Sequence, residues 1–149
     1  MTSIAPATPA DCAECARLLV AQLDEHGIGA SAERLAHVLE AVVADPARGF
    51  LLVAREDARA VGVAYVATIL SAEHGGPAAW LEELYVEPER RDRGVGTTLL
   101  AAVLDRARAL GLLAVDLEID AGHARVASLY RRHGFRQLDR SRWVREMRT

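Results

Sequence analysis

The spacing of apolar and polar positions changes repeatedly along the chain, and each change predicts a new secondary-structure element. In the first third, apolar residues recur at helical spacing in two runs, which begin after Thr8 and Ser31 and end near Gly27 and Asp45. A short strand over 3–5 precedes both runs. The N-terminal third is therefore expected to form one strand followed by two amphipathic helices.

Shorter runs rich in β-branched residues follow. The runs at 50–54 and 61–70 are separated by a polar turn, which predicts a hairpin, and 78–86 returns as a third strand. The remaining expected elements are a helix from about 94 to 110, a strand over 112–119, a helix over 124–133, and two strands over 135–138 and 142–147. In the first of these helices the buried face is expected to contain Leu100, Val103, Leu104, Ala107 and Leu110.

A glycine-containing corner joins the strand at 78–86 to the following helix. It reads Arg91-Asp92-Arg93-Gly94-Val95-Gly96-Thr97-Thr98. Glycine lets the backbone approach a bulky group closely, and the amides of a first helical turn have no intrahelical acceptor. Free amides at the positive end of a helix dipole bind anions, most naturally a phosphate. The segment is therefore expected to be a strand–loop–helix cradle for a pyrophosphate.

The strand, corner, helix and next strand form a unit over about 81–119. Its two strands are expected to pair in parallel, which places the corner at the carboxyl edge of the sheet. No repeat or linker interrupts the order of elements. The sequence thus predicts one mixed α/β domain over residues 1–149.

The composition of the chain limits the kinds of partner that it is expected to bind. A net charge of -3 argues against nucleic acid as a partner, because phosphate backbones favour a basic face. No apolar run is long enough to span a bilayer, and the first residues do not resemble a signal peptide, so a cytoplasmic protein without membrane contact is expected. The chain contains no lysine, which excludes Schiff-base chemistry and a Walker lysine.

Two groups of residues suggest metal or redox chemistry, and neither pattern is convincing. Cys12 and Cys15 form a Cys-x-x-Cys pair inside an expected helix with no second pair, so they are interpreted as reduced, small helix residues. The five histidines show no metal-ligand spacing. No metal is predicted.

From these residues the chain resembles the GNAT superfamily of N-acetyltransferases. The expected order of elements matches along nearly the whole chain, and the specific match covers 81–135. The strand end Leu84-Tyr85-Val86, a Pro-Glu turn and Arg91-x-x-Gly94-x-Gly96 are similar to the family's acetyl-CoA signature, Arg/Gln-x-x-Gly-x-Gly/Ala. The run Leu-Tyr-Arg-Arg-His-Gly-Phe at 129–135 strengthens the resemblance. A dinucleotide-binding fingerprint fails, because its third glycine would fall at Leu99.

The resemblance implies a single-domain GNAT fold, with a mixed sheet of about six to seven strands flanked by about four helices. It also implies that the backbone of Leu84 and Val86 pairs with the pantetheine arm of acetyl-CoA, as an added strand does. The expected acetyl-CoA contacts are Leu84, Tyr85, Val86, Arg91, Asp92, Arg93, Gly94, Val95, Gly96, Thr97, Thr98, His123 and Tyr130. His123 stands where the family often has Asn, and its role is left open.

The implied chemistry is direct attack of an amine on acetyl-CoA in a ternary complex. A backbone N–H near Leu84 or Tyr85 would polarise the thioester carbonyl. A carboxylate is the natural base for the ammonium, and Glu83 is favoured slightly over Glu82. In a regular strand these neighbours point to opposite faces, and a bulge would change which one enters the cleft. Tyr130 matches the family's general acid for the leaving thiolate.

Several functions stay open at this stage. The favoured one is an N-acetyltransferase acting on a primary amine of a small molecule or a peptide. The alternatives are a non-catalytic acyl-CoA-binding or regulatory module, and an O-acyltransferase or longer-chain acyltransferase. The acidic residues near the sheet edge hint at a cationic acceptor such as a polyamine, an aminoglycoside or a peptide amine. Dimers are common in the family, and the C-terminal strands with Trp143 are a candidate contact for a homodimer.

Overall fold

The computed structural model describes residues 2–120 and 124–148. The chain forms two compact units, Met1–Glu118 and Ile119–Thr149, and each is treated by itself. Whether the two units make the single domain predicted from the sequence stays a prediction. The first unit holds one sheet and three α-helices, and the second holds one α-helix followed by an irregular segment.

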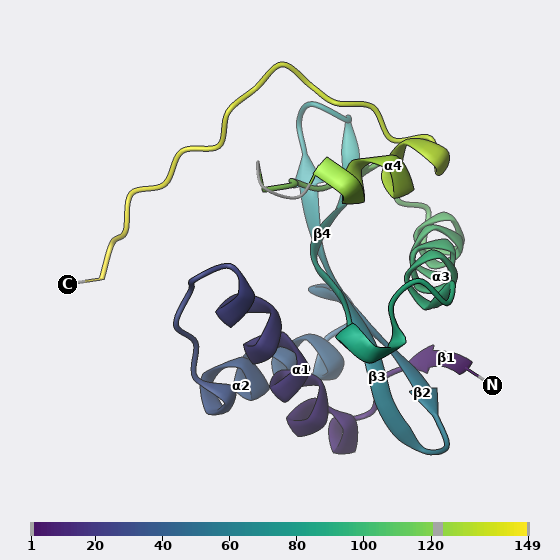
Figure 1. The fold of residues 1–149 in the computed structure, drawn as a ribbon. Coiled ribbons are helices and arrows are strands. Elements are labelled where there is room, and N and C mark those ends of the chain that lie inside the picture. The colour runs from purple at the N-terminus through teal and green to yellow at the C-terminus, as the bar shows by residue number, and fades with distance from the viewer. Residues whose placement is uncertain (1, 121–123, 149) are drawn as a thin grey trace. The chain divides into compact units, whose positions relative to one another are not determined.

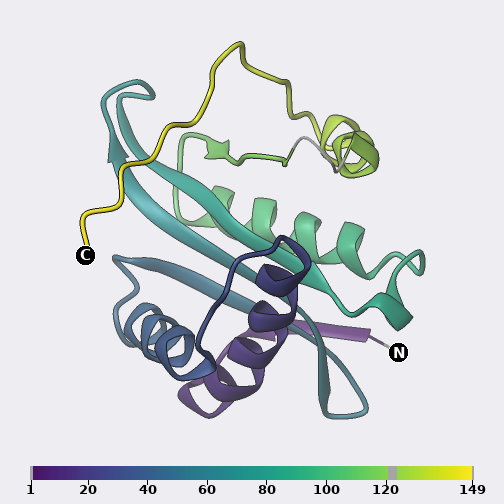
Figure 2. The same ribbon diagram turned by 60° about the vertical axis from the view of Figure 1, so that its left-hand side comes forward.

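The first unit is a three-layer α/β arrangement (Figures 1 and 2). Its five strands lie in the order β1(Thr2–Pro6), β2(Gly49–Glu56), β3(Arg59–Ser71), β4(Gly76–Val86) and β5(Val115–Asp116). Helices α1(Cys12–Glu25) and α2(Ala32–Ala44) cover one face, and α3(Val95–Ala109) covers the other. The predicted α/β class is confirmed, and the predicted order of elements is confirmed from β1 to α4.

The sheet is mixed, as expected. β1 to β4 pair antiparallel with their neighbours, whereas β4 and β5 pair in parallel through the crossover helix α3. The β4–β5 ladder contains only Ala79 with Val115 and Trp80 with Asp116. From Leu81 onward β4 therefore has no strand partner on that edge among the described residues.

Local sequence signals explain where the first two helices begin. A 3-10 turn, η1(Pro9–Asp11), precedes α1, and Thr8 and Asp11 form a reciprocal capping box around it. Ser31 caps α2 by accepting a hydrogen bond from the Arg34 N–H at 3.3 Å. The predicted Ser31 cap is confirmed, whereas Thr8, predicted to cap the first helix, caps the 3-10 turn that leads into it, and Asp11 is the N-cap residue of α1.

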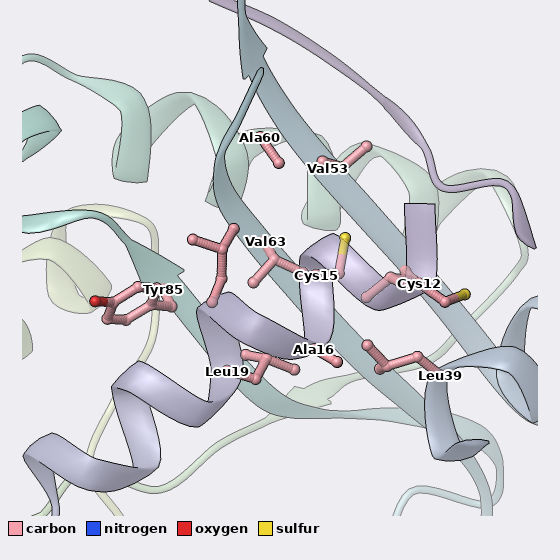
Figure 3. Close-up of a cluster of buried hydrophobic side chains, with 11 residues drawn as sticks. Cys12, Cys15, Ala16, Leu19, Leu39, Val53, Ala60, Val63 and Tyr85 are labelled. Atoms are coloured by element: carbon pink, nitrogen blue, oxygen red, sulfur yellow. The ribbon is translucent and has the colours of Figure 1, made fainter. Parts of the chain in front are cut away.

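One cluster of the first unit's core lies between α1, α2 and the sheet, and on the opposite face α3 buries Leu99, Leu100 and Val103. Figure 3 shows Leu19 and Leu39 packed against Val53 and Val63, with the Tyr85 hydroxyl pointing away from the cluster. Cys12 and Cys15 are fully buried here and form no disulfide. Burial is the main factor that raises the pKa of Cys15, to about 12, so this thiol stays protonated at neutral pH.

Three expectations for the strands and helices need correction. The strand predicted over 112–119 is ordered as a strand only at Val115–Asp116. Leu110, expected on the buried face of α3, is 48% exposed because the helix ends there. The described sheet has five strands rather than the six to seven predicted.

The strands predicted over 135–138 and 142–147 are wrong, because the described residues after α4(Ala124–Arg132) form no regular structure. The Phe135 N–H instead donates to the Tyr130 carbonyl at 3.1 Å, past Gly134 at φ 88°, which closes the end of α4. An alternating pattern becomes a strand only when another strand satisfies its backbone groups, and no described strand pairs with this segment. Trp143 is 90% exposed there, and its role in a homodimer stays a prediction.

Candidate functional site

The corner after β4 has the local backbone geometry that the predicted anion cradle requires. After β4 a 3-10 turn, η2(Pro88–Arg90), leads into the loop, where Asp92 and Gly94 both adopt positive φ, 63° and 81°. Gly94 is the N-cap of α3, and this left-handed conformation favours glycine. The first backbone bond of α3 runs from Thr98 N–H to Gly94 O at 3.0 Å. The amides of Val95, Gly96 and Thr97 precede it and have no intrahelical acceptor.

Gly96 is the second glycine of the corner. A Cβ added there would meet only Val86 Cγ2, at 3.8 Å, which is ordinary van der Waals contact. Neither crowding nor positive φ requires glycine at this position. The space it leaves fits close approach of a bulky phosphate group to the backbone, which is what acetyl-CoA would need.

The side chains of the corner divide into structural and exposed groups. Val95 is buried in the core, and the Thr98 hydroxyl donates to the Gly94 carbonyl at 2.8 Å. Thr97 and Arg93 are exposed, and no hydrogen bond or ion pair of Arg93 occurs among the described residues. Arg93 therefore keeps its charge available for a phosphate.

Arg91, favoured with Arg93 as a phosphate contact, is held elsewhere in this structure. Its Nε donates to the Val86 carbonyl at 2.9 Å, and Nη2 pairs with Glu25 of α1 at 3.1 Å. The guanidinium also lies 5.3 Å from the centroid of the Tyr85 ring. Arg91 thus ties the loop to the end of β4 and to α1, which sets the position of the cradle.

The last residues of β4 alternate in the direction of their peptide groups. Glu87 N–H donates to Val61 O at 2.9 Å, so the backbone of Glu87, and by the period of two that of Tyr85, faces β3. The peptide groups of Leu84 and Val86 consequently face the edge away from β3. Their carbonyls accept hydrogen bonds from Gln22 Nε2 at 3.3 Å and from Arg91 Nε at 2.9 Å. This edge has the direction that an added strand requires.

A β-bulge interrupts β4 at the predicted carboxylates. Tyr65 of β3 faces Glu83 and Val66 faces Leu81, so Glu82 is the extra residue. The strict alternation expected of a regular strand therefore does not hold. Glu82 and Glu83 line the same cavity, and Glu82 is exposed whereas Glu83 is half-buried.

That cavity has a volume of about 220 Å³ and lies between β4 and the two N-terminal helices. Its other walls are Leu19, Leu23, Leu35, Val38, Leu39 and Tyr65. Burial, with a further contribution from the charge of Glu82, raises the pKa of the Tyr65 hydroxyl, which therefore stays protonated at neutral pH. Tyr65 was missed by sequence reasoning, because only the β3–β4 register brings it beside Glu83.

Two predicted site residues remain, His123 and Tyr130, and both come after residue 119. His123 lies outside the described residues. Tyr130 lies on α4 in the second unit, where it is 8% exposed and meets the Phe135 ring edge-on, with the centroids 5.5 Å apart. Its proposed part in the chemistry stays a prediction.

One group of three metal-ligand side chains occurs among the described residues. His74 Nε2 lies 2.9 Å from Asp116 Oδ2 and 3.8 Å from Glu73 Oε1. The direct contact with Asp116 ties the β3–β4 turn to β5. Histidine spacing in the sequence gave no sign of this group, because Asp116 comes from a distant strand.

Relatives of the chain include proteins named as acetyltransferases of several kinds. A segment of 93 residues is 43% identical to mycothiol acetyltransferase of Clavibacter michiganensis, covering 62% of this chain and 28% of that protein. The chain thus spans little more than a quarter of the length of that relative. An aminoglycoside N(6')-acetyltransferase type 1 of Stenotrophomonas maltophilia is 32% identical over 143 residues, which cover 93% of this chain and 88% of the relative.

Solved structures share the fold. An integron cassette protein from the mobile metagenome of Cole Harbour Salt Marsh has a TM-score of 0.86 at 22% identity, over 98% of this chain and 91% of that one. A structure described as a predicted acetyltransferase with acetyl-CoA from Clostridium acetobutylicum has a TM-score of 0.82 at 18% identity, over 97% and 96% of the two chains. The family model for the acetyltransferase (GNAT) family matches residues 14–135. The chain belongs to the GNAT acetyltransferase family.

Proposed function

We propose that the chain transfers the acetyl group of acetyl-CoA to a primary amine by direct attack in a ternary complex. The observation that carries this proposal is the end of β4. There, one short stretch contributes two carboxylates to a cavity, an outward-facing backbone edge at Leu84 and Val86, and the entrance to the glycine corner. A base, a strand-like binding edge and an anion cradle are the parts that amine acetylation needs.

In this proposal the corner binds the pyrophosphate and the strand edge binds the pantetheine. The amides of Val95, Gly96 and Thr97 face the phosphates, together with the exposed Arg93 side chain. Leu84 supplies the N–H that polarises the thioester carbonyl, since the Tyr85 peptide faces β3. Acetyl-CoA supplies the activated acyl group.

Three side chains handle the protons and the charge of the reaction. Glu83 accepts the proton of the ammonium, either directly or through a water, and Glu82 holds the cation beside it. Tyr130 donates a proton to the departing thiolate. The assignment of Glu83 as base rests on its lower exposure and on its place opposite Tyr65 in the ladder.

Release of free thiol from acetyl-CoA, measured with and without a panel of amines, tests this function. Amine-dependent release is the expected result. Cofactor binding without release for any amine would favour the non-catalytic acyl-CoA-binding module instead. Release with alcohols but not with amines would favour the O-acyltransferase.

A further inference from the structure

The side chains that line the cavity beside Glu82 and Glu83 favour some amines over others. Five of its eight lining residues are aliphatic side chains of α1 and α2: Leu19, Leu23, Leu35, Val38 and Leu39. The charged groups on the wall are Glu82 and Glu83, and no basic residue is among the lining residues. The cavity therefore attracts one cation at one side and offers apolar surface to everything else.

A second cavity, of about 370 Å³, adjoins the first along Val38 and Tyr65, which line both. Its other walls are Ala41, Val42, Thr68 and Arg48. Arg48 brings a positive charge to this end, paired with Asp45 at 3.5 Å. A ligand that extends past Tyr65 meets aliphatic surface, Thr68 and the Arg48–Asp45 ion pair, and no carboxylate is among the residues that line this second cavity.

We infer that the acceptor is a primary amine with a single positive charge and an apolar body, such as an arylalkylamine. This inference rests on the proposed function and narrows its substrate class. A polyamine or an aminoglycoside would have to place a second ammonium against leucine side chains or towards Arg48. Against the leucines such a group gains no partner, and beside Arg48 it meets a like charge that is already paired with Asp45, so polycations are disfavoured.

Tyr65 and the β-bulge also favour an amine with a single charge. Because Glu82 is the extra residue of the bulge, both carboxylates flank the same ammonium, one as counter-ion and one as base. The protonated Tyr65 hydroxyl adds a neutral hydrogen-bonding group to the wall. The cavity thus provides polar partners at one end only.

The test compares the rate of CoA release for 2-phenylethylamine, ethanolamine, spermidine and kanamycin. The expected result is a kcat/KM for 2-phenylethylamine at least about tenfold above those of the other three, the scale on which hydrophobic pockets discriminate. A higher kcat/KM for spermidine or kanamycin overturns the inference and leaves the proposed function standing. No release with any amine overturns both.

A variant makes the test specific to the apolar wall. Val38 is 45% exposed and lines both cavities, so Val38→Asp adds a carboxylate there without opening the core. This variant should lower kcat/KM for 2-phenylethylamine about tenfold or more and raise it for spermidine. Ala32→Asp adds the same charge on the exposed first turn of α2, away from both cavities, and should change neither value. Equal effects of the two variants would overturn the inference, because net charge alone would then explain them.

Discussion

Glu83 is half-buried in the cavity wall, whereas Glu82, one residue earlier, is exposed at the bulge. Replacing Glu83 with Gln keeps the shape and removes the proposed base, so kcat should fall by about 10²- to 10⁴-fold while the Kd for acetyl-CoA stays unchanged. Steady-state kinetics and calorimetric titration measure the two quantities.

Glu89→Gln is the matched control, because Glu89 is an exposed residue of η2 outside the cavity. It should leave kcat unchanged. If Glu83→Gln behaves like this control while Glu82→Gln loses activity, the two carboxylates exchange roles.

Tyr130 belongs to the second unit and matches the family's general acid. Tyr130→Phe retains the edge-on contact with Phe135 and removes the hydroxyl. Turnover should fall much more than acetyl-CoA affinity, as judged by kcat and Kd measured side by side. Unchanged turnover would remove Tyr130 from the mechanism.

Asp11 shows how a single carboxylate couples stability to pH. The Thr8 N–H donates to Asp11 Oδ2 at 2.7 Å, and this hydrogen bond is the largest cause of the lowered pKa of Asp11, with Arg55 adding to it. A lowered folded pKa means that the stabilisation is present above the unfolded value of about 3.9 and is lost as pH falls through the folded value.

Asp11→Asn should therefore reduce the free energy of unfolding at pH 7 by about 1 kcal/mol, the usual scale for a helix cap. The difference from the wild type should shrink below about pH 3.9. Urea unfolding across pH 3 to 7 measures it. Asp57→Asn, in the exposed β2–β3 turn, is the control. A difference independent of pH would contradict the assignment.

At the scale of elements, a substitution in the glycine corner before α3 tests ligand binding separately from folding. An added Cβ at Gly96 meets no close neighbour, and alanine is the better helix former. Gly96→Ala should leave the free energy of unfolding unchanged or raise it by up to about 1 kcal/mol. It should also weaken acetyl-CoA binding about tenfold, which corresponds to about 1.4 kcal/mol.

Calorimetric titration and thermal unfolding give the two quantities for the same variant. Asp105→Ala, exposed further along α3, is the control and should not change acetyl-CoA binding. Unchanged binding by Gly96→Ala would mean that the ligand does not approach the backbone at this corner.

The elements also show what the sequence could predict. The Ser31 cap, the β2–β3 hairpin and the glycine corner follow from local signals in the sequence, and the parallel β4–β5 pair follows from the strand–helix–strand order. The bulge does not, because adjacent polar residues such as Glu82 and Glu83 fit either a bulge or a solvated strand. Only the register against Tyr65 distinguishes these, and register is a long-range property.

The same reason explains the strands predicted wrongly after Gly134. The alternation around Trp143 is a genuine β pattern, yet a strand depends on a partner that local sequence does not specify. Helix α4, whose backbone bonds are internal, was predicted over 124–133 and occurs over Ala124–Arg132. Local bonding makes helices easier to predict than strands.

At the scale of the whole molecule, the family match over 14–135 includes parts of both units. No helix in the described part of the chain is long and apolar enough to cross a membrane. The chain as a whole carries a net charge of -3. An anionic ligand is therefore attracted locally, by the few exposed arginines near the corner, Arg93 among them.

Acetyl-CoA should stabilise the folded chain by mass action. At a hundred times its Kd it adds about 2.7 kcal/mol, which raises Tm by roughly 5 to 10 °C for a protein of this size. CoA should act similarly, because the corner is proposed to bind the pyrophosphate that both share. Thermal unfolding with each ligand measures the shifts. If neither changes Tm, the cradle does not bind the cofactor.

The most direct measurement is mass spectrometry of the products after incubating the chain with acetyl-CoA and 2-phenylethylamine. The account predicts N-acetylated amine and free CoA in a one-to-one ratio, formed only when both substrates are present and lost in Glu83→Gln. Acetyl-CoA binding without acetylated amine, from 2-phenylethylamine or any other amine tested, would contradict it.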